Sequence, residues 1–271
     1  PDFLFFGHTK NIKISTLDQF KSMNNNLIIS QWNEDPIMPS LTYSKTNINN
    51  ISNYGKHVDH NFITTHPSIF TKQIKDLNNI SFLFVPVDRN IECYNVTKLK
   101  PRKDLFYAMS HGVNRASLKK GKSDNRINFL NKLVTQLKSI NYDFYGFENK
   151  EPIWGNDFYK ALINSKMGLN LSRGLPTKYY SSNRIASLMG NGLLTFIDQK
   201  TQMNDFFNKK EIISYSSIED LSDKIEFYKK NDKIRKIIAN NGRNKYFKLF
   251  NELITTKYIL DKSFGKTVNF Y

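Results

Sequence analysis

The sequence predicts an α/β fold made of two domains with mostly parallel sheets. Two observations support this: short apolar segments typical of strands alternate with amphipathic segments typical of helices, and polar turns separate them. The clearest unit spans residues 164–198, where an apolar strand, a polar loop, a short helix and a second strand follow one another. A βαβ unit of this kind joins two parallel strands through a right-handed crossover. A chain of 271 residues has room for two such domains.

The first domain is expected to hold four strands, at residues 2–6, 27–31, 61–65 and 80–85. An amphipathic helix with Leu17 and Phe20 on its apolar face separates the first two. The Asn-, Ser- and Thr-rich segment 39–55 shows no periodicity and is predicted to be a loop. Residues 88–102, which include Pro101, are predicted to connect the two domains. Because the chain begins with Pro1 directly before a strand, we also expect the first domain to be incomplete.

The second domain repeats the alternation of strands and helices. Its predicted strands are residues 104–109, 142–145, 167–171, 193–197 and 211–215. Between and after them, helices are predicted near 125–137, at 156–165, at 182–189 and from Ser217 onward. A break in the helical pattern is predicted near Asn241-Gly242, before a last helix at 245–260. The order of elements predicts a second parallel sheet covered by helices.

The composition limits the classes of partner and compartment. The net charge is +16, from 40 Lys and Arg against 24 Asp and Glu, which favours anionic partners such as nucleotides, phosphorylated or lipid-linked glycans, lipid headgroups or nucleic acid. A Lys- and Asn-rich chain is also typical of an AT-rich genome, so charge alone does not predict nucleic-acid binding. The single cysteine, Cys93, excludes an intrachain disulfide and fits a reducing compartment. With no apolar run of about 18 residues, we expect a cytoplasmic protein, with the inner membrane face as an alternative location.

A first phosphate site is predicted in the loop of the 164–198 unit. In open α/β sheets, ligands bind beyond the carboxyl ends of the strands, and a helix N-terminus attracts anions. Cationic and hydroxyl side chains gather there: Arg173, Lys178, Tyr180, Ser181, Ser182 and Arg184. The alternative is purely structural, with Ser182 capping the helix and Arg184 in solvent.

A second phosphate site is predicted after the strand at 104–109. The loop that follows combines glycine with several basic residues, among them Arg115, Lys119 and Lys120. Backbone amides and cationic side chains at a strand end suit a diphosphate. A solvated basic hairpin is the alternative.

Several of these positions resemble a known family. Residues 170–172, together with Ser182, Arg184, Ser187 and Gly192, are similar to the donor-binding core of GT-B-fold glycosyltransferases, in particular the spore-maturation-type group with a "glycosyl transferases group 1" C-terminal domain. The similarity is specific between about residues 104 and 251. One position departs from the pattern, because the family's glutamate, which holds the ribose in many members, is Ser187 here.

The resemblance implies a GT-B-like fold of two Rossmann-like domains. Residues 1–95 would form the acceptor-side domain, residues 96–250 the nucleotide-sugar-binding domain, and residues 251–271 a helix and tail packing back on the first domain. It also implies a glycosyltransferase that moves a sugar from a nucleotide-sugar donor to a glycan, lipid-linked saccharide or protein acceptor. In that reading the two basic loops hold the donor diphosphate and Tyr145 lies near the nucleotide base, with Ser187 close to the ribose.

The chemistry expected is metal-independent and needs no cofactor. The sequence has no Asp-x-Asp motif, while cationic side chains are present to neutralise the leaving diphosphate. The catalytic candidates are Asp35 and His8, with Asp59 and His111 as weaker ones, and the stereochemistry is left open. Three other functions remain: a nucleotide-sugar 2-epimerase, an inactive transferase, and a non-enzymatic module that binds nucleic acid or anionic membranes.

Overall fold

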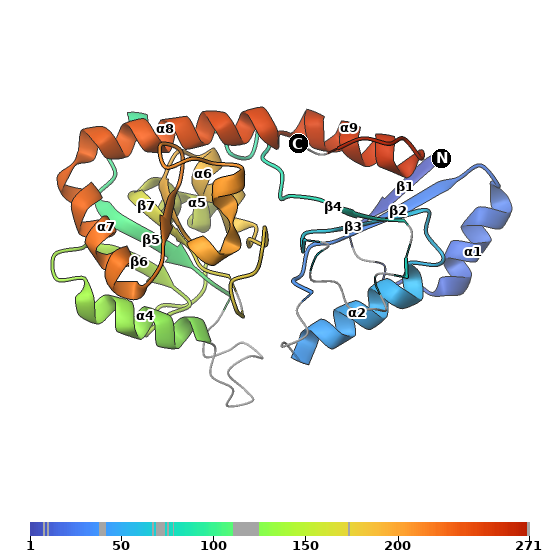
Figure 1. Cartoon of the computed structure of the whole chain (residues 1–271), viewed down its shortest axis with the longest axis horizontal. Helices are drawn as coiled ribbons and strands as arrows, with labels where there is room; N and C mark the ends of the chain where they lie inside the picture. Colours follow the sequence, from blue (N-terminus) through green and yellow to red (C-terminus); the bar gives the residue numbers. More distant parts are fainter. Residues whose placement is uncertain are drawn as a thin grey trace. The chain divides into compact units, whose positions relative to one another are not determined.

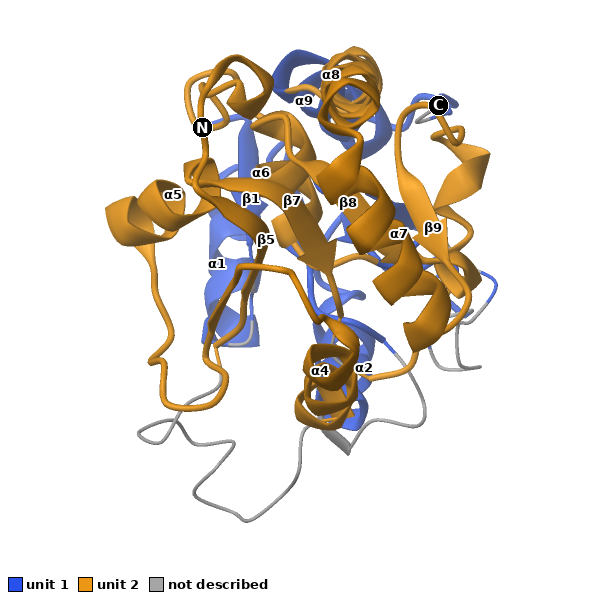
Figure 2. Cartoon of the chain, turned by 90° about the vertical axis from the view of Figure 1, so that its left-hand side faces the viewer, with its two compact units in different colours: residues 1–86, 178–180, 252–271 blue, residues 87–177, 181–251 orange. Residues whose placement is uncertain are grey.

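The computed structural model describes residues 1–7, 9, 11–37, 42–66, 68, 74, 76–77, 79–110, 125–172 and 174–269. The chain divides into two compact units, shown in Figure 2. Unit 1 comprises residues 1–86, 178–180 and 252–271, and unit 2 comprises residues 87–177 and 181–251. Each unit contains a parallel sheet, so the predicted α/β class with two parallel sheets is confirmed. The first crossing between units lies at residues 86/87, where the sequence predicted 95/96.

Unit 1 is built on a four-stranded parallel sheet in the order β1-β2-β3-β4 (Figure 1). The strands are β1 (Phe3–Phe6), β2 (Ile28–Asn33), β3 (His60–Ile63) and β4 (Ile80–Phe82). Its helices are α1 (Ile14–Met23), α2 (Thr42–Tyr54) and α9 (Glu252–Ser263).

Strand alternation sends neighbouring side chains of unit 1 to opposite faces of the sheet. Ile29 packs with Leu17 of α1. The next residue, Ser30, instead hydrogen-bonds Ser263 at the end of α9 at 2.8 Å. α1 and α9 therefore cover opposite faces of this sheet, as Figure 1 shows.

Helix α2 corrects the prediction of a loop at 39–55. The segment has low helix propensity and a polar composition, but three of its residues are buried and spaced as one helical face: Ser44, Ile48 and Ile51. Ile48 and Ile51 pack on Ile63 of β3. Tertiary burial, and not local propensity, fixes this helix.

Unit 2 is built on a five-stranded parallel sheet in the order β6-β5-β7-β8-β9. The strands are β5 (Lys103–Ala108), β6 (Tyr142–Tyr145), β7 (Ser165–Asn170), β8 (Leu194–Asp198) and β9 (Ile213–Tyr215). The helices are α4 (Asn125–Gln136), α5 (Gly155–Ile163), α6 (Arg184–Gly190), α7 (Ile218–Lys230) and α8 (Asp232–Leu249), with short 3-10 turns η2 (Val96–Lys98), η3 (Gln199–Thr201) and η4 (Met203–Asp205).

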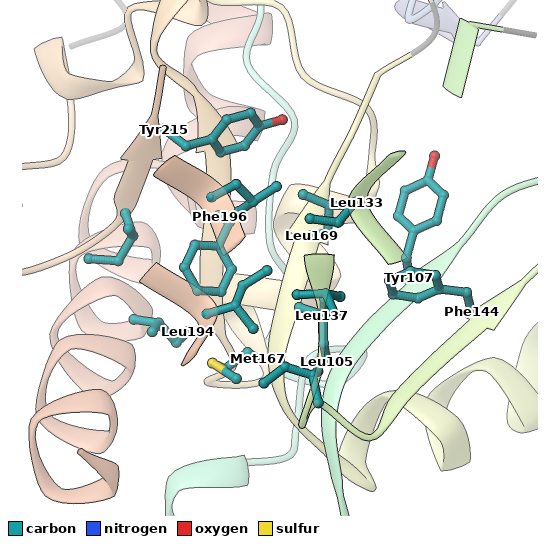
Figure 3. Packing of buried hydrophobic residues seen from close by; sticks show 14 of the residues in the cluster. Leu105, Tyr107, Leu133, Leu137, Phe144, Met167, Leu169, Leu194, Phe196 and Tyr215 are labelled. Atoms are coloured by element: carbon teal, nitrogen blue, oxygen red, sulfur yellow. The ribbon is translucent and has the colours of Figure 1, made fainter. Parts of the chain in front are cut away.

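Two apolar layers cover the sheet of unit 2. On one face, the side chains of β5, β7 and β8 pack under α4 and α7, as Figure 3 shows for Leu105, Leu169 and Leu194. On the other face, Phe106 and Leu188 belong to a second cluster beneath α5 and α6. The helices that the sequence predicted near 125–137, at 156–165, at 182–189 and from Ser217 onward therefore cover the sheet.

Helix α8 runs without the break that was predicted at Asn241-Gly242. Gly242 serves close packing, since a Cβ atom there would lie 2.1 Å from the carbonyl oxygen of Glu211. The chain leaves the helical path later, at Phe250 and Asn251, so the predicted last helix at 245–260 is divided between α8 and α9. In the described parts of the chain, no helix has the length and apolar character needed to cross a bilayer.

Candidate functional site

The strand order of unit 2 places a topological switch point between β5 and β7. The chain moves from β5 outward to β6 on one side and later from β7 to β8 on the other. At such a point the loops leave the carboxyl ends of the two strands in opposite directions, and ligands of open α/β sheets bind in the crevice between them. Here these ends are Ala108 of β5 and Asn170 of β7.

Asn170 organises the loop that follows β7. Its buried side chain donates to Ser181 Oγ at 2.5 Å and accepts from Ser182 Oγ at 2.9 Å. The backbone amide of Ser182 donates to Ser172 Oγ at 3.2 Å. The predicted ligand hydroxyls of Ser181 and Ser182 therefore fold the loop back onto the end of β7.

This geometry also corrects the alternative in which Ser182 caps the helix. Helix α6 begins at Arg184, its N-cap is Asn183, and the cap makes no side-chain hydrogen bond to the helix. With seven residues, α6 is a short helix whose dipole is a small contribution. Cationic side chains must supply most of the positive potential at this end of the sheet.

Arg184 is held at the switch point and not in open solvent. Its Nη2 donates to the carbonyl oxygen of Leu171 at 2.8 Å, and its guanidinium carbon lies 4.8 Å from the centre of the Tyr107 ring. The hydroxyl of Tyr107 donates to the same carbonyl at 3.2 Å. A half-buried positive charge is thus fixed between the carboxyl ends of β5 and β7.

Ser187 lies one turn along α6 and contacts a carboxylate only through another side chain. Ser187 hydrogen-bonds the hydroxyl of Tyr159 on α5. That hydroxyl donates in turn to Glu92 Oε1 at 3.4 Å. Burial raises the pKa of Glu92, although hydrogen bonds from Asp88 and Tyr159 oppose the shift. The sequence analysis missed Glu92, because a single glutamate in a connecting segment carries no spacing signal.

Tyr145 is the last residue of β6, on the other side of the switch point. Its hydroxyl donates to Asp143 Oδ2 at 3.0 Å, and Lys150 Nζ lies 5.2 Å from its ring centre. Burial, with the Asp143 charge next, raises the pKa of Tyr145 to about 12. A neutral, oriented ring at this strand end is chemically able to stack on a base.

Lys178 and Tyr180 do not share a unit with the rest of the predicted loop, because residues 178–180 belong to unit 1. Within that unit, Lys178 Nζ lies 4.8 Å from the ring of Tyr179, which meets His66 edge-on at 4.8 Å. Burial, followed by the charge of Lys178, lowers the pKa of His66. Tyr180 is buried. The single cationic cluster expected from the sequence is therefore divided.

Several predicted site residues lie outside the described residues: His8, His111, Arg115, Lys119, Lys120 and Arg173. Of the remaining acid candidates, Asp35 is half-buried in unit 1, where its backbone amide donates to Asn33 Oδ1 at 3.2 Å. Asp59 accepts from Lys21 at 2.5 Å and from the Ile29 amide at 2.7 Å, which is a structural role. Across the described ranges, no group of three or more His, Cys, Asp or Glu residues is arranged to hold a metal ion.

A cavity of about 150 Å³ lies beyond the carboxyl ends of β7, β8 and β9. Its walls come from the first turns of α4, the loop after β7, and the ends of the two neighbouring strands. The lining residues are Asn125, Arg126, Phe129, Asn170, Leu171, Ser172, Gly174, Leu175, Pro176, Asp198, Thr201 and Tyr215. The lining residues from α4, β8 and β9 were not predicted as site residues, because they meet only after the sheet has formed.

The comparisons with known proteins agree with this fold. Residues 124–251, from the start of α4 to the end of α8, match the model of a family described as "Glycosyl transferase-like". No curated protein matches the chain. The predicted resemblance to GT-B-fold glycosyltransferases is confirmed, and residues 124–251 are similar to this family.

Solved structures of the GT-B class are similar in fold to the chain. An alpha-glucosyltransferase in complex with UDP and a 13-mer DNA gives a TM-score of 0.63 at 10% identity, over 97% of this chain and 80% of that one. HepE of Anabaena in complex with UDP and glucose gives 0.60 at 10% identity, over 97% and 78%. TarM gives 0.61 at 12% identity, over 96% of this chain and only 54% of its own. The GT-B-like fold is thereby confirmed.

Proposed function

We propose that this protein is a glycosyltransferase that moves a sugar from a nucleotide-sugar donor to a glycan or lipid-linked saccharide. The family match over residues 124–251 is the observation that carries the proposal, because it covers the sheet edge where Arg184, Asn170 and the cavity lie. Nucleotide ligands bound to neighbours of the same fold, UDP in HepE and in the alpha-glucosyltransferase, support this class of donor.

The proposed chemistry neutralises the leaving diphosphate with side chains and without a metal ion or cofactor. Arg184 supports this proposal, since its charge is fixed between the ends of β5 and β7 where a diphosphate would lie. A preorganised cation stabilises the negative charge that grows on the leaving group and needs no reorganisation during the reaction. Arg115, Lys119, Lys120 and Arg173 are proposed to add to it.

The acceptor side of the reaction is proposed to use a carboxylate or imidazole of unit 1 as base. Asp35 is the first choice and His8 the second. If Asp35 is the base, Asp35→Asn lowers kcat and leaves the affinity for the nucleotide unchanged. The acceptor is proposed to be held at an anionic membrane surface, which the net charge of +16 favours.

A thermal-shift panel tests the donor proposal. UDP, GDP, CMP and ADP are each added with and without magnesium. A ligand at a hundred times its dissociation constant adds about 2.7 kcal/mol to the free energy of unfolding. We expect one nucleotide to raise the melting temperature equally with magnesium and with EDTA. A shift that requires magnesium contradicts the metal-independent chemistry, and no shift with any nucleotide contradicts the transferase.

The alternative function is a basic module that binds nucleic acid or anionic membranes, which the net charge of +16 permits but does not by itself predict. Such a module loses affinity linearly on a logarithmic salt scale, because bound counterions are released. Binding to duplex DNA or to anionic vesicles with a steep salt dependence, and no response to any nucleotide, would favour it over the transferase.

A further inference from the structure

The cavity beyond β7, β8 and β9 is adjacent to the predicted phosphate site but built from different residues. Its lining shares Asn170 and Ser172 with the loop network, and its other walls come from α4, β8 and β9. We propose that this cavity binds one pyranose ring of the transfer reaction, either the sugar of the donor or the terminal sugar of the acceptor. This inference rests on the proposed function, because it names the part of the substrate that the cavity takes.

The size of the cavity suits a single six-membered ring. Its volume of about 150 Å³ equals that of an engineered protein cavity that takes up benzene. Because the cavity is open to solvent on one side, a larger substrate can place one ring in it while the rest of the molecule extends outside.

The lining has the mixed character that a sugar ring requires. Phe129 and Tyr215 give it two aromatic rings, with centroids 6.1 Å apart and planes inclined by 44°. Aromatic faces pack well against the apolar C–H surface of a pyranose. Among the described lining residues, the charged side chains are one guanidinium, Arg126, and one carboxylate, Asp198, which can donate to and accept from sugar hydroxyls.

Tyr215 is the strongest sign that a ligand belongs here. Its side chain is 2% exposed, and its hydroxyl has no hydrogen-bond partner in the described parts of the protein. A buried hydroxyl without a partner destabilises a folded protein, and a bound water, ion or ligand is a common explanation for one. Figure 3 shows the hydroxyls of Tyr215 and Tyr107 on the side of the apolar cluster away from Leu105 and Met167. A sugar hydroxyl in the cavity would satisfy the Tyr215 group.

Asp198 supplies an acceptor in the same wall. Its Oδ1 accepts the backbone amide of Lys200 at 2.8 Å, which fixes the carboxylate at the start of η3. Among the described residues, its Oδ2 makes no hydrogen bond. A fixed carboxylate oxygen next to an unused phenol is suited to two neighbouring hydroxyls of one sugar.

Two conservative variants isolate these groups. Tyr215→Phe removes only the hydroxyl and leaves the ring in the core. Asp198→Asn keeps the oxygen that can accept the Lys200 amide and removes the charge. Tyr228→Phe on α7 is the matched control, because Tyr228 is a half-buried tyrosine of the same unit outside the cavity lining.

The binding test is saturation-transfer difference NMR of the whole chain with glucose, galactose, mannose and N-acetylglucosamine. We expect at least one sugar to receive saturation from the wild type. Tyr215→Phe should weaken that binding roughly three- to tenfold, as the loss of a neutral hydrogen bond does, and Asp198→Asn roughly tenfold or more, as the loss of a charge-assisted one does. Tyr228→Phe should bind as the wild type does. No transfer to any sugar, or equal transfer in all four proteins, would overturn the proposal.

A second readout excludes a purely structural role for the hydroxyl. Because the Tyr215 hydroxyl has no hydrogen-bond partner among the described residues, Tyr215→Phe should keep or raise the melting temperature while it weakens sugar binding. A clear fall in melting temperature would mean that the hydroxyl has a structural partner, and would contradict the proposal.

Comparing UDP with UDP-glucose separates the two sources of the sugar and tests the proposed function independently. If the ring belongs to the donor, Tyr215→Phe weakens UDP-glucose and leaves UDP unchanged. If it belongs to the acceptor, neither changes and the KM for a saccharide acceptor rises. A wild type that binds a free sugar through Tyr215 but no nucleotide supports the cavity and contradicts the transferase.

Discussion

Arg184 and Tyr107 donate hydrogen bonds to the same carbonyl oxygen, that of Leu171, from 2.8 and 3.2 Å. The guanidinium also lies 4.8 Å from the Tyr107 ring centre, within the range of a cation–π interaction. This contact joins the end of β5, the end of β7 and the start of α6. It fixes a positive charge where the strand order predicts a ligand.

Arg184→Ala should therefore lower both stability and donor affinity. The loss of a charge-assisted hydrogen bond to a half-buried carbonyl costs about 1–3 kcal/mol of unfolding free energy. If Arg184 contacts the donor diphosphate, UDP affinity falls by a further factor of about ten or more. Urea denaturation measures the first effect and isothermal titration with UDP the second.

Arg184→Lys is the informative companion, because lysine keeps the charge but not the planar fork. We expect it to recover part of the UDP affinity and little of the stability. Arg102→Ala, at an exposed arginine directly before β5, is the control and should change neither quantity. UDP affinity that is unaltered in Arg184→Ala would show that the arginine has only the structural role.

Asn170→Ala should release the loop after β7. The buried amide donates to Ser181 Oγ and accepts from Ser182 Oγ, so its removal leaves the Ser182 hydroxyl without its acceptor, while Ser181 Oγ still donates to the Ser182 carbonyl. We expect a loss of about 1–3 kcal/mol in unfolding free energy. Hydrogen exchange of the Ser182 amide should accelerate, since its bond to Ser172 depends on the folded loop. Asn251→Ala removes a side-chain hydrogen bond to the Phe247 carbonyl at 2.8 Å, outside this loop, and should leave that exchange rate unchanged.

The sequence predicts the second sheet well, because each strand contains apolar or aromatic residues and is bounded by polar turns. All five were expected within a few residues of their observed bounds, including β7 and β8 of the central βαβ unit. The wrong predictions share one cause. Helix α2 and the unbroken α8 depend on contacts that form only in the folded unit, such as Ile51 on Ile63 and Gly242 against Glu211.

The site could be predicted only in part for the same reason. The carboxyl end of β7 and Arg184 follow from the βαβ pattern. Three other features of the site join residues that are distant in the chain: the hydrogen bonds of Asn170, the indirect link of Ser187 to Glu92, and the cavity wall at Asp198 and Tyr215. No spacing rule connects such residues before the strand order is known.

His60 should make unit 1 less stable in acid. Burial, and then the charge of Lys262, lowers its pKa to about 4, so below its ordinary pKa the unfolded chain binds a proton that the folded chain does not. Stability is therefore lost as the pH falls from about 6.5 toward 4. His60→Gln, which keeps a donor toward Ser81, should flatten this part of the profile measured by urea denaturation. His57→Gln is the control at a more exposed histidine, and an identical flattening there would contradict the assignment to His60.

Glu92 should act on stability in the opposite direction. Burial raises its pKa above the ordinary value of 4.5, so just above that pH the folded protein holds a proton that the unfolded chain releases. Stability therefore falls as the pH rises from 4.5 through the raised pKa. Glu92→Gln removes this titration, and its free energy of unfolding should decline less over that interval than that of the wild type. Glu151→Gln, at an exposed glutamate, is the control. Because Tyr159 connects Glu92 to Ser187, the same variant should also raise the KM for the nucleotide sugar if Ser187 lies at the ribose, and an unchanged KM would separate this carboxylate from the donor site.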